Sequence, residues 1–519
     1  MSQMLRSSGA TAAATMLSRV LGLVREIVYA NFMGASWVAG AFALAFQIPN
    51  LFRRLLGEGA LTAAFIPVFK NKEKTEGPEA MWQAANAVVS GLLVASAVIV
   101  AAAIVGISVV LGVVHFDEAG TVLMLKLLRV MFPYLLLVCL AAVCMGMLNA
   151  RGHFFVPALG AALLNVVMIG SVFLIAPRMG EQPQEQIFGL AIGVLLAGFA
   201  QAAFQMPLLF REGFHFRWIQ PWRDPTVRHV VKQMLPATIG VAAFQLNVML
   251  ANGFAFAIEP EIVAAFGYAV RLMELPQGVF GVSLAMYLLP TLSGLAAEKK
   301  FPEFRATLRE GLGYLLFINL LATVLLIVLA EPIIRLLFER GEFDAAATHR
   351  VTFGLMALAP GLVAFSCVNI FARAFYALGD TKTPMKISVF CLVLNAVLTL
   401  PLVWFIREAG LGIANTATAF INFALLAFAL RKKIARLELA ELRRPFLALL
   451  ACSAAAAGAA WVSTWYWEGR LGHGNFWLKV GAVFAPMTAA GLVYFALAFA
   501  LRVPFAQDVL KLARRRRRA

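Results

Sequence analysis

Apolar stretches follow one another along almost the whole chain, separated by short polar segments. A helix that crosses a bilayer needs about 20 consecutive, mainly apolar residues. By that criterion the sequence predicts about 14 transmembrane helices, and therefore an all-α polytopic membrane protein. The predicted spans are residues 8–33, 38–66, 84–114, 123–150, 156–177, 187–210, 232–258, 263–296, 308–330, 348–378, 384–406, 410–431, 445–467 and 475–502.

Basic residues gather in every second segment between these spans. Examples are residues 70–74, 211–232 and 431–444, whereas the alternate segments are poorer in cations. Cytoplasmic loops of membrane proteins carry an excess of Lys and Arg. The alternation therefore places the basic segments and both chain ends in the cytoplasm, in agreement with an even number of spans.

The composition leaves no room for a large soluble domain, because 61% of the 519 residues are hydrophobic and only 14% are charged. The net charge of +17 lies in the connecting segments and in the tail Lys511–Ala519, which suits an anionic inner leaflet better than nucleic acid. The five cysteines lie in apolar stretches and form no CxxC pair. The sequence contains no HExxH motif, Walker loop or nucleophile elbow. We therefore expect no catalytic residue, metal, disulfide framework or cofactor, and no ATPase domain in this chain.

Two halves of the chain repeat with a constant offset of 227 residues. Six matched pairs carry the repeat: Gln47 with Glu274, Pro49 with Pro276, Asn50 with Gln277, Pro133 with Pro360, Gly152 with Gly379 and Pro157 with Pro384. Six spans separate equivalent positions, so both copies have the same orientation in the membrane. Parallel repeats of this kind are related by an axis along the membrane normal and hold the binding site between them.

The repeat predicts two six-helix bundles followed by two additional helices. We expect residues 1–220 to form the first bundle and 221–438 the second, with the extra helices in 439–502 and a basic cytoplasmic tail in 503–519. Proline removes a backbone N–H group and clashes with the preceding helical turn. Pro49 and Pro276 should therefore bend equivalent helices.

The stretch AFALAFQIPNLFRRLLGEGA, residues 41–60, is apolar enough for a membrane and yet carries several polar groups. At about 100° per residue, Asn50, Arg54 and Glu58 lie on one helical face, with Arg53 beside them. An arginine near the bilayer centre costs at least about 2.5–3.5 kcal/mol on insertion scales. The polar face therefore indicates a helix that lines a water-filled cavity. The alternative is that Arg53 and Arg54 reach lipid phosphates from the end of a span.

Two further predicted spans carry charges of the same kind. The first contains Arg19, Arg25 and Glu26, and the eighth contains Arg271 and Glu274. With the second span, these helices hold five arginines against three glutamates. Because a guanidinium stays charged in a poor dielectric and binds phosphate through two parallel hydrogen bonds, the surplus favours a diphosphate ligand. The alternative is that each glutamate neutralises an arginine in an internal ion pair: Arg25–Glu26, Arg54–Glu58 and Arg271–Glu274.

Three segments resemble the MurJ/MviN lipid II flippases of the MOP exporter superfamily: SRVLGLVRE, then QIPNLFRRLLGEGALTAAFIPVF, then YAVRLMELPQGVFGVSL. The likeness extends in order over essentially the whole chain, and the PNLFRRLLGEGA block is quite specific to that family. The resemblance implies a fourteen-helix flippase in the bacterial inner membrane. By alternating access it would move undecaprenyl-diphosphate-linked muropeptide (lipid II) from the cytoplasmic to the periplasmic leaflet for peptidoglycan synthesis.

The resemblance also assigns roles to individual residues. The family's cavity arginines correspond to Arg19, Arg25, Arg53 and Arg271, which would hold the diphosphate. The polar groups around them would support the cavity: Glu26, Asn50, Arg54, Glu58 and Glu274. The last two helices of the family form a lipid-facing groove for the polyprenyl tail, which suits the two extra spans here. The expected partners are lipid II and membrane lipids, with cell-wall synthesis proteins as further candidates.

The sequence departs from some family members at positions linked to cation coupling. Those members carry acidic residues where this chain has Gly40 and Val270. Some also have a sodium site of carboxylates and amides in spans 7 and 11, whereas those spans here offer only amides: Gln245, Asn247, Asn252 and Asn395. This departure argues against sodium coupling, and we expect the membrane potential to matter more than any cation gradient.

Other functions remain open at this point. The nearest is an exporter of another lipid-linked oligosaccharide or of small amphiphiles, although cationic drugs would need carboxylates rather than arginines. A membrane-embedded glycosyltransferase or ligase would need a catalytic carboxylate or His in a large periplasmic loop, for which only residues 331–350 are long enough. A scaffold for cell-wall enzymes would leave the arginines without a role. Product formation by the purified protein would distinguish an enzyme from a flippase.

Overall fold

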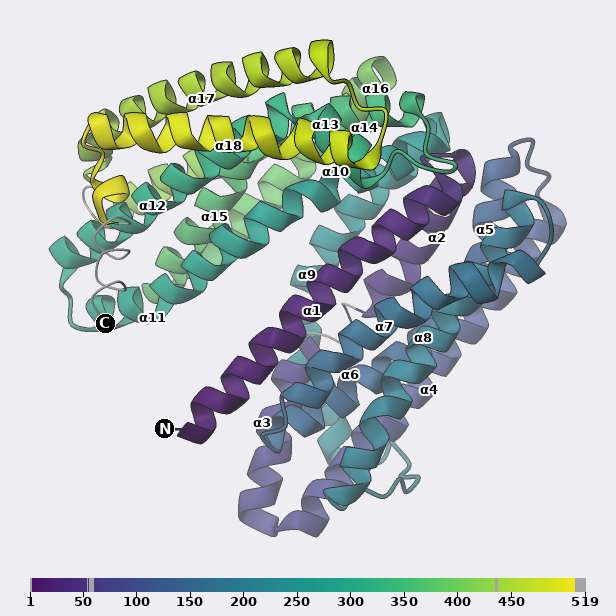
Figure 1. The fold of residues 1–519 in the computed structure, drawn as a ribbon. Helices are drawn as coiled ribbons and strands as arrows, with labels where there is room; N and C mark the ends of the chain where they lie inside the picture. Colours follow the sequence, from purple (N-terminus) through teal and green to yellow (C-terminus); the bar gives the residue numbers. More distant parts are fainter. Residues whose placement is uncertain (1, 54, 56–59, 435–436, 509–519) are drawn as a thin grey trace. The chain divides into compact units, whose positions relative to one another are not determined.

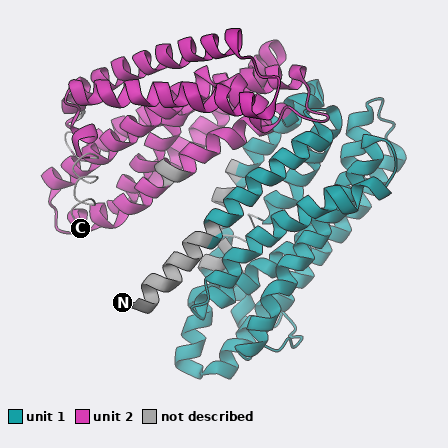
Figure 2. Ribbon diagram, viewed as in Figure 1, with its two compact units in different colours: residues 1–264 teal, residues 265–519 magenta. Residues whose placement is uncertain are grey.

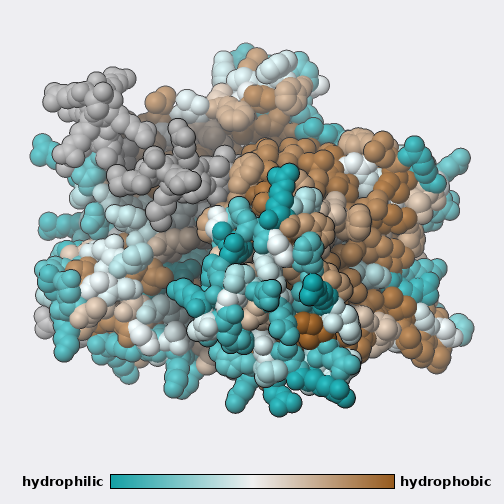
Figure 3. All heavy atoms as spheres, turned by 90° about the horizontal axis from the view of Figure 1, so that it is seen from below, coloured by the Kyte–Doolittle hydropathy of each residue, from teal (hydrophilic) through white to brown (hydrophobic). Residues whose placement is uncertain are grey.

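A computed structural model describes residues 2–53, 55, 60–434 and 437–508 (Figure 1). All regular secondary structure in these ranges is helical, so the all-α polytopic fold expected from the sequence is confirmed. By length and hydropathy, seven of the described helices could cross a membrane, or nine when each of two bent helix pairs counts as one span. Hydrophobic residues gather into a broad exposed surface, as a lipid-facing exterior requires (Figure 3).

The chain divides into two compact units, Met1–Ala264 and Ala265–Ala519 (Figure 2). The helices of unit 1 are α1 (Ser2–Met33), α2 (Trp37–Phe52), α3 (Ala60–Glu76), α4 (Pro78–Val113), α5 (Ala119–Met131), α6 (Tyr134–Ala150), α7 (Phe155–Leu174), η2 (Ala176–Arg178), α8 (Pro183–Arg211) and α9 (Pro225–Ile258). Helix α7 packs against both α1 and α8. One core cluster joins α3, α4 and α6, with the rings of Phe69 and Trp82 5.5 Å apart. Helix α10 (Pro260–Pro276) runs from unit 1 into unit 2.

Unit 2 contains the remaining helices and both of the additional ones. They are η3 (Gln277–Val282, a π-helix), α11 (Ser283–Ala297), α12 (Phe301–Val328), α13 (Ala330–Leu337), α14 (Ala345–Leu358), α15 (Gly361–Ala377), α16 (Lys382–Lys433), η4 (Leu439–Leu442), α17 (Arg443–Arg470) and α18 (Phe476–Ala500). Helices α17 and α18 pack against each other and against α12. Tyr494 of α18 is buried and donates from its hydroxyl to the backbone oxygen of Phe317, at 2.6 Å.

The predicted spans coincide with single helices or with consecutive helices of the structure. Spans 384–406 and 410–431 are joined in α16, where Ile406 and Arg407 leave the helical conformation and Arg407 has a φ of 48°. The expected loop 331–350 is wrong in part, because α13 and the start of α14 occupy much of it. Helix α13 has only 8 residues, too few for a span-length criterion to detect. The division at 220, 438 and 502 stays a prediction; by contacts, α9 belongs to unit 1.

Matched positions of the repeat have matched backbone breaks. The pair α5 and α6 is bent by 45° at Pro133, and the pair α14 and α15 is bent by 44° at Pro360. Gly152 and Gly379 both have positive φ, 90° and 73°, a region that glycine enters without steric cost. The two halves therefore share local geometry as well as sequence offset.

The helices that contain Pro49 and Pro276 are also interrupted at equivalent places. Helix α2 ends three residues after Pro49, and the backbone at Arg53 and Leu55 is π-helical. Helix α10 ends at Pro276 and is followed directly by η3. The bends expected at Pro49 and Pro276 stay a prediction. The π-helical turns that follow both prolines are of a kind that occurs often at functional sites.

Gly40 in α2 explains one departure from the family pattern. A Cβ atom added there would lie 2.0 Å from the backbone oxygen of Pro260, at the start of α10. Backbone cannot move aside as a flexible side chain can, so no acidic side chain fits without displacing a helix.

We expect Gly40→Val to destabilise the protein by about 1–3 kcal/mol or more, because it overpacks this contact. Thermal unfolding of the purified protein in detergent would measure the effect. Gly106→Ala is the matched control, since nothing lies within 4 Å of a Cβ at Gly106 and a helical Gly→Ala change is favourable. Equal melting temperatures for Gly40→Val and the parent would contradict the prediction.

Candidate functional site

Arg25 is a residue of α1 that contacts α7, and its charge is compensated by Glu26. Its Nη2 donates to Glu26 Oε1 at 2.6 Å, and the two side chains are only 13% and 15% exposed. The guanidinium carbon lies 5.8 Å from the ring centroid of Tyr29, and Nη1 contacts Met168 Sδ of α7 at 3.9 Å. Arg25 Nε is buried without a hydrogen-bond partner among the described residues. Separating this pair without a replacement anion would leave a buried charge, at a cost of about 3–5 kcal/mol.

Arg19 lies on the same helix in a different environment. It is exposed, and among the described residues it forms no ion pair. Next to it, Asn165 of α7 donates from Nδ2 to the backbone oxygen of Ser18 at 3.2 Å, which fixes α1 against α7. Arg19 is therefore an exposed residue of α1, and a hydrogen bond from α7 fixes the position of that helix.

Arg53 lies in the π-helical turn that follows Pro49. Its Nε donates to Asn50 Oδ1 at 2.6 Å, so Asn50 orients the guanidinium of Arg53. One turn earlier, Gln47 Oε1 accepts a hydrogen bond from Asn252 Nδ2 of α9 at 2.8 Å. Arg54 and Glu58 lie outside the described residues, so their part of this face stays a prediction.

Arg271 and Glu274 form an ion pair on α10, in unit 2. The distance from Nη1 to Oε2 is 2.9 Å, and the side chains are 50% and 51% exposed. Exposed helical pairs of this kind contribute about 0.3–0.5 kcal/mol. Arg271 can therefore exchange its partner for another anion at little cost, in contrast to Arg25.

Two of the three internal ion pairs named as an alternative are thus formed, Arg25–Glu26 and Arg271–Glu274. Arg19, Arg25 and Arg53 belong to unit 1, and Arg271 belongs to unit 2. Their assembly around one ligand is part of the proposal below.

Two of the four amides considered for a sodium site form side-chain hydrogen bonds. Asn252 binds Gln47, and Asn395 Nδ2 donates to Thr418 Oγ1 at 3.2 Å within α16. Within the part of the chain that the structure describes, no group of three or more His, Cys, Asp or Glu side chains could hold one metal ion.

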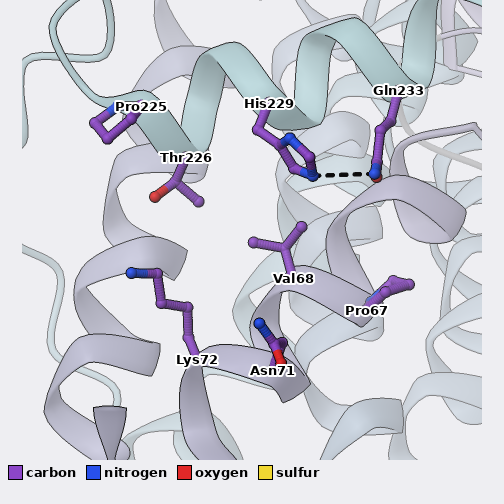
Figure 4. A pocket seen from close by; sticks show the side chains of 8 residues that line it. All are labelled: Pro67, Val68, Asn71, Lys72, Pro225, Thr226, His229 and Gln233. Atoms are coloured by element: carbon purple, nitrogen blue, oxygen red, sulfur yellow. Dashed lines mark hydrogen bonds between the residues drawn. The ribbon is translucent and has the colours of Figure 1, made fainter. Parts of the chain in front are cut away.

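A pocket of about 420 Å³ lies between α3 and α9, and none of the predicted site residues lines it (Figure 4). Its lining is Pro67, Val68, Asn71, Lys72, Pro225, Thr226, His229 and Gln233. Lys72 pairs with Glu76 at 2.6 Å, and His229 is hydrogen-bonded to Gln233 at 3.0 Å. The pocket therefore offers polar groups without a surplus of charge.

Ionic contacts that the sequence did not single out join segments far apart in the chain. Glu212, just after α8, accepts from Arg151 Nε at 2.8 Å and lies 2.7 Å from His153 Nε2; Arg151 also pairs with Glu73 of α3. In unit 2, Arg350 pairs with the buried Glu408 beside the break in α16. The sequence showed only that these residues are charged. It could not show which of them pair, because the partners are 58 or more residues apart.

The Glu212 contacts predict a dependence of stability on pH. Hydrogen bonds from His153 and Arg151 lower the pKa of Glu212, and a hydrogen bond from Lys70 lowers the pKa of Glu73. Both carboxylates therefore stabilise the fold above the ordinary Glu pKa of about 4.3, and the contribution is lost as pH falls through their folded values.

We expect Glu212→Gln to cost about 1 kcal/mol at neutral pH and to weaken the fall in melting temperature on acidification below pH of about 5. Glu79→Gln is the matched control, because Glu79 is exposed and forms no ion pair among the described residues. Identical pH profiles for Glu212→Gln and Glu79→Gln would show that the network does not stabilise the protein.

The fold is shared with solved membrane transporters. The structure titled "Lipid II flippase MurJ, inward closed conformation" matches with a TM-score of 0.78 and 22% identity, covering 96% of this chain and 99% of that one. An inward-facing multidrug resistance MATE family transporter of the MOP superfamily matches with a TM-score of 0.67 and 15% identity, over 83% of this chain and 98% of that one. This chain therefore has the helical fold of these polytopic membrane transporters.

Sequence comparison narrows the class. The family model described as "Lipid II flippase MurJ" matches residues 29–480. A probable lipid II flippase MurJ of Vibrio cholerae is 33% identical over 512 residues, covering 96% of this chain and 95% of that protein. The lipid II flippase MurJ of Burkholderia cenocepacia is 33% identical over 427 residues, covering 81% and 82%. The chain belongs to the lipid II flippase MurJ family, and is thus a multi-pass membrane transporter rather than an enzyme.

Proposed function

We propose that this protein moves lipid II from the cytoplasmic to the periplasmic leaflet of the bacterial inner membrane by alternating access, for peptidoglycan synthesis. The observation that carries the proposal is the set of arginines in α1, in the break after α2 and in α10: Arg19, Arg25, Arg53 and Arg271. Guanidinium groups suit the diphosphate of this substrate because each can bind two phosphate oxygens.

The four arginines differ in how readily they bind a phosphate. Arg19 is exposed, and Arg271 leaves an exposed pair with Glu274 at little cost. Arg25 is largely buried and paired with Glu26. It therefore binds only a ligand whose negative charge replaces that of Glu26. Arg19 and Arg271 make first contact in this scheme, and Arg25 completes the site.

The extra helices are proposed to guide the polyprenyl tail. Apolar side chains are exposed along both: Trp461 (64%), Trp465 (69%), Phe484 (55%) and Leu492 (68%). A groove on α17 and α18 would keep the lipid in the hydrocarbon while the headgroup crosses beside the arginines. This arrangement includes the division into two bundles, 1–220 and 221–438, and the extra helices in 439–502.

The basic segments support the proposed orientation. Residues 70–74, 211–232 and 431–444 would lie in the cytoplasm with both termini, by the positive-inside rule. Cell-wall synthesis proteins that make or use the substrate are proposed as further partners.

A sided accessibility assay for lipid II in cells depleted of this protein tests the function. We expect lipid II to become inaccessible on the periplasmic face and to accumulate inside, with recovery when the intact gene is restored. Unchanged exposure of lipid II, with accumulation of a different lipid-linked oligosaccharide, would instead support the alternative exporter.

A further inference from the structure

Residues 211–232 run from the end of α8 through the connecting segment into the first turns of α9, and they expose aromatic and basic side chains together. Phe216, Trp218 and Trp222 are 50%, 54% and 61% exposed. Five cations of the segment are also exposed: Arg211, Arg217, Arg223, Arg228 and Lys232. Within the described ranges none of these cations forms an ion pair. We call residues 211–232 the basic aromatic segment.

The two acids of the segment are occupied elsewhere. Glu212 binds Arg151 and His153, and Asp224 caps α9 by accepting from the backbone N–H groups of Thr226 and Val227. The five cations therefore face outward without a neutralising carboxylate of their own segment.

The segment is held in place by polar side chains of α4. Asn86 accepts from the backbone N–H of Arg217 and donates to the backbone oxygen of His215, both at 3.0 Å. Ser90 Oγ accepts from the backbone N–H of Ile219 at 3.3 Å. Asn86 and Ser90 are 3% and 0% exposed, so these bonds lie inside the protein.

Packing fixes both ends of residues 214–221. Phe214 is buried, with its ring 5.6 Å from that of Trp82 on α4, and Pro221 is buried against Gly91. The backbone of 214–220 is non-helical but is bound along its length. The exposed rings and cations are thus presented by a positioned backbone.

The segment also lies at a suitable depth for a membrane surface. Helix α4 has 36 residues, which at 1.5 Å per residue makes it about 54 Å long, against a hydrocarbon core of about 30 Å. The turns around Asn86, near the start of α4, therefore extend toward the headgroup region. Aromatic rings are enriched at that level, and Lys and Arg are attracted to anionic lipids there.

We propose that the basic aromatic segment is a binding surface for anionic phospholipid headgroups, with Asn86 and Ser90 as the residues that position it. Trp218, Trp222 and Phe216 lie at the boundary of the acyl chains, and Arg217, Arg223 and Arg228 bind the phosphates. The proposal concerns the lipid around the protein and does not depend on which substrate is transported.

The test is quenching of tryptophan fluorescence by brominated lipid in nanodiscs that hold the full-length protein. Brominated phosphatidylglycerol and brominated phosphatidylcholine with the same chains are compared, each diluted in unbrominated phosphatidylcholine. We expect stronger quenching by phosphatidylglycerol. In the variant Arg217→Gln/Arg223→Gln/Arg228→Gln this preference should fall roughly fivefold or more, since each cation near an anionic surface strengthens binding by about fivefold.

Control variants separate a specific surface from general charge. Lys382→Gln/Lys386→Gln/Arg431→Gln removes the same charge from exposed positions in unit 2 and should keep the preference. Asn86→Ala keeps every charge and ring but releases the backbone, and should weaken the preference; Ser90→Ala is the milder version if Asn86→Ala unfolds. Equal effects of both triple variants, or no effect of Asn86→Ala and Ser90→Ala in folded protein, would overturn the proposal. Loss of the preference on adding inorganic phosphate, but not chloride of equal ionic strength, would indicate a soluble phosphate site instead and would also overturn it.

Discussion

Arg271→Ala should abolish the ability of this protein to support growth while leaving its level and melting temperature close to normal. The ion pair with Glu274 is about half exposed, so its loss costs the fold about 0.3–0.5 kcal/mol. A guanidinium that binds the substrate phosphate contributes far more, since removing one partner of a desolvated charge pair costs about 2–5 kcal/mol, or roughly 30-fold to several thousand-fold in binding. The large functional loss and small structural loss are measured by complementation and thermal unfolding.

The same experiment extends to the other three arginines. Ala at Arg19, Arg25 or Arg53 should also abolish complementation, and Lys should rescue poorly because it lacks the two-pronged donor geometry. Arg25→Ala will also lower stability, because it removes the contact of 2.6 Å between Arg25 Nη2 and Glu26 Oε1. Arg178→Ala, at an exposed position outside the site, is the matched control and should complement normally.

Glu274→Gln distinguishes ligand binding from the internal ion-pair alternative. If Arg271 serves only its pair with Glu274, the two substitutions should be equally harmful. If Arg271 binds a phosphate, Glu274→Gln should be tolerated, because it removes a carboxylate that competes with the phosphate. Normal growth of all four Ala variants would show that the arginines do not form an anion site.

The helices could be predicted from the sequence because the length of an apolar run is a local property. Proline is a weaker guide: α10 ends at Pro276 and α2 ends three residues after Pro49, whereas Pro207 and Pro486 lie inside α8 and α18. Where the local signal was weak, as in the short α13, the prediction was wrong.

Contacts between helices could not be predicted, because they depend on the neighbouring helix. The pair Arg25–Glu26 was open as an alternative because the two residues are adjacent, but nothing in the sequence indicated that Arg25 also contacts Met168 of α7. The tight approach of Gly40 to Pro260 has no signal within α2 itself. The sequence does not distinguish Asn86 from other polar residues. Its hydrogen bond with the backbone N–H of Arg217 can be seen only in the folded protein.

Transport should depend on the membrane potential more than on any cation gradient. The cytoplasm is electrically negative, and the proposed substrate carries a diphosphate of about −2, so crossing 100 mV outward would gain roughly 4–5 kcal/mol at ~2.3 kcal/mol per charge. The chain's own residues offer little for sodium: α9 contains no carboxylate, and Asn252 and Asn395 already bind Gln47 and Thr418.

The measurement is lipid II exposure on the periplasmic face after an ionophore collapses the potential while the sodium and proton gradients are held. We expect exposure to fall sharply, because a driving force of roughly 4–5 kcal/mol corresponds to a ratio above a thousand between the leaflets at equilibrium. Removing sodium at constant potential is the matched control and should leave exposure unchanged. The opposite pattern, with flipping kept after depolarisation and lost without sodium, would mean that the amides of α9 and α16 coordinate an ion in another conformation. Gln245 and Asn247 would then be the first residues to replace, since they lie on the same helix as Asn252 and their amide oxygens could serve as ligands.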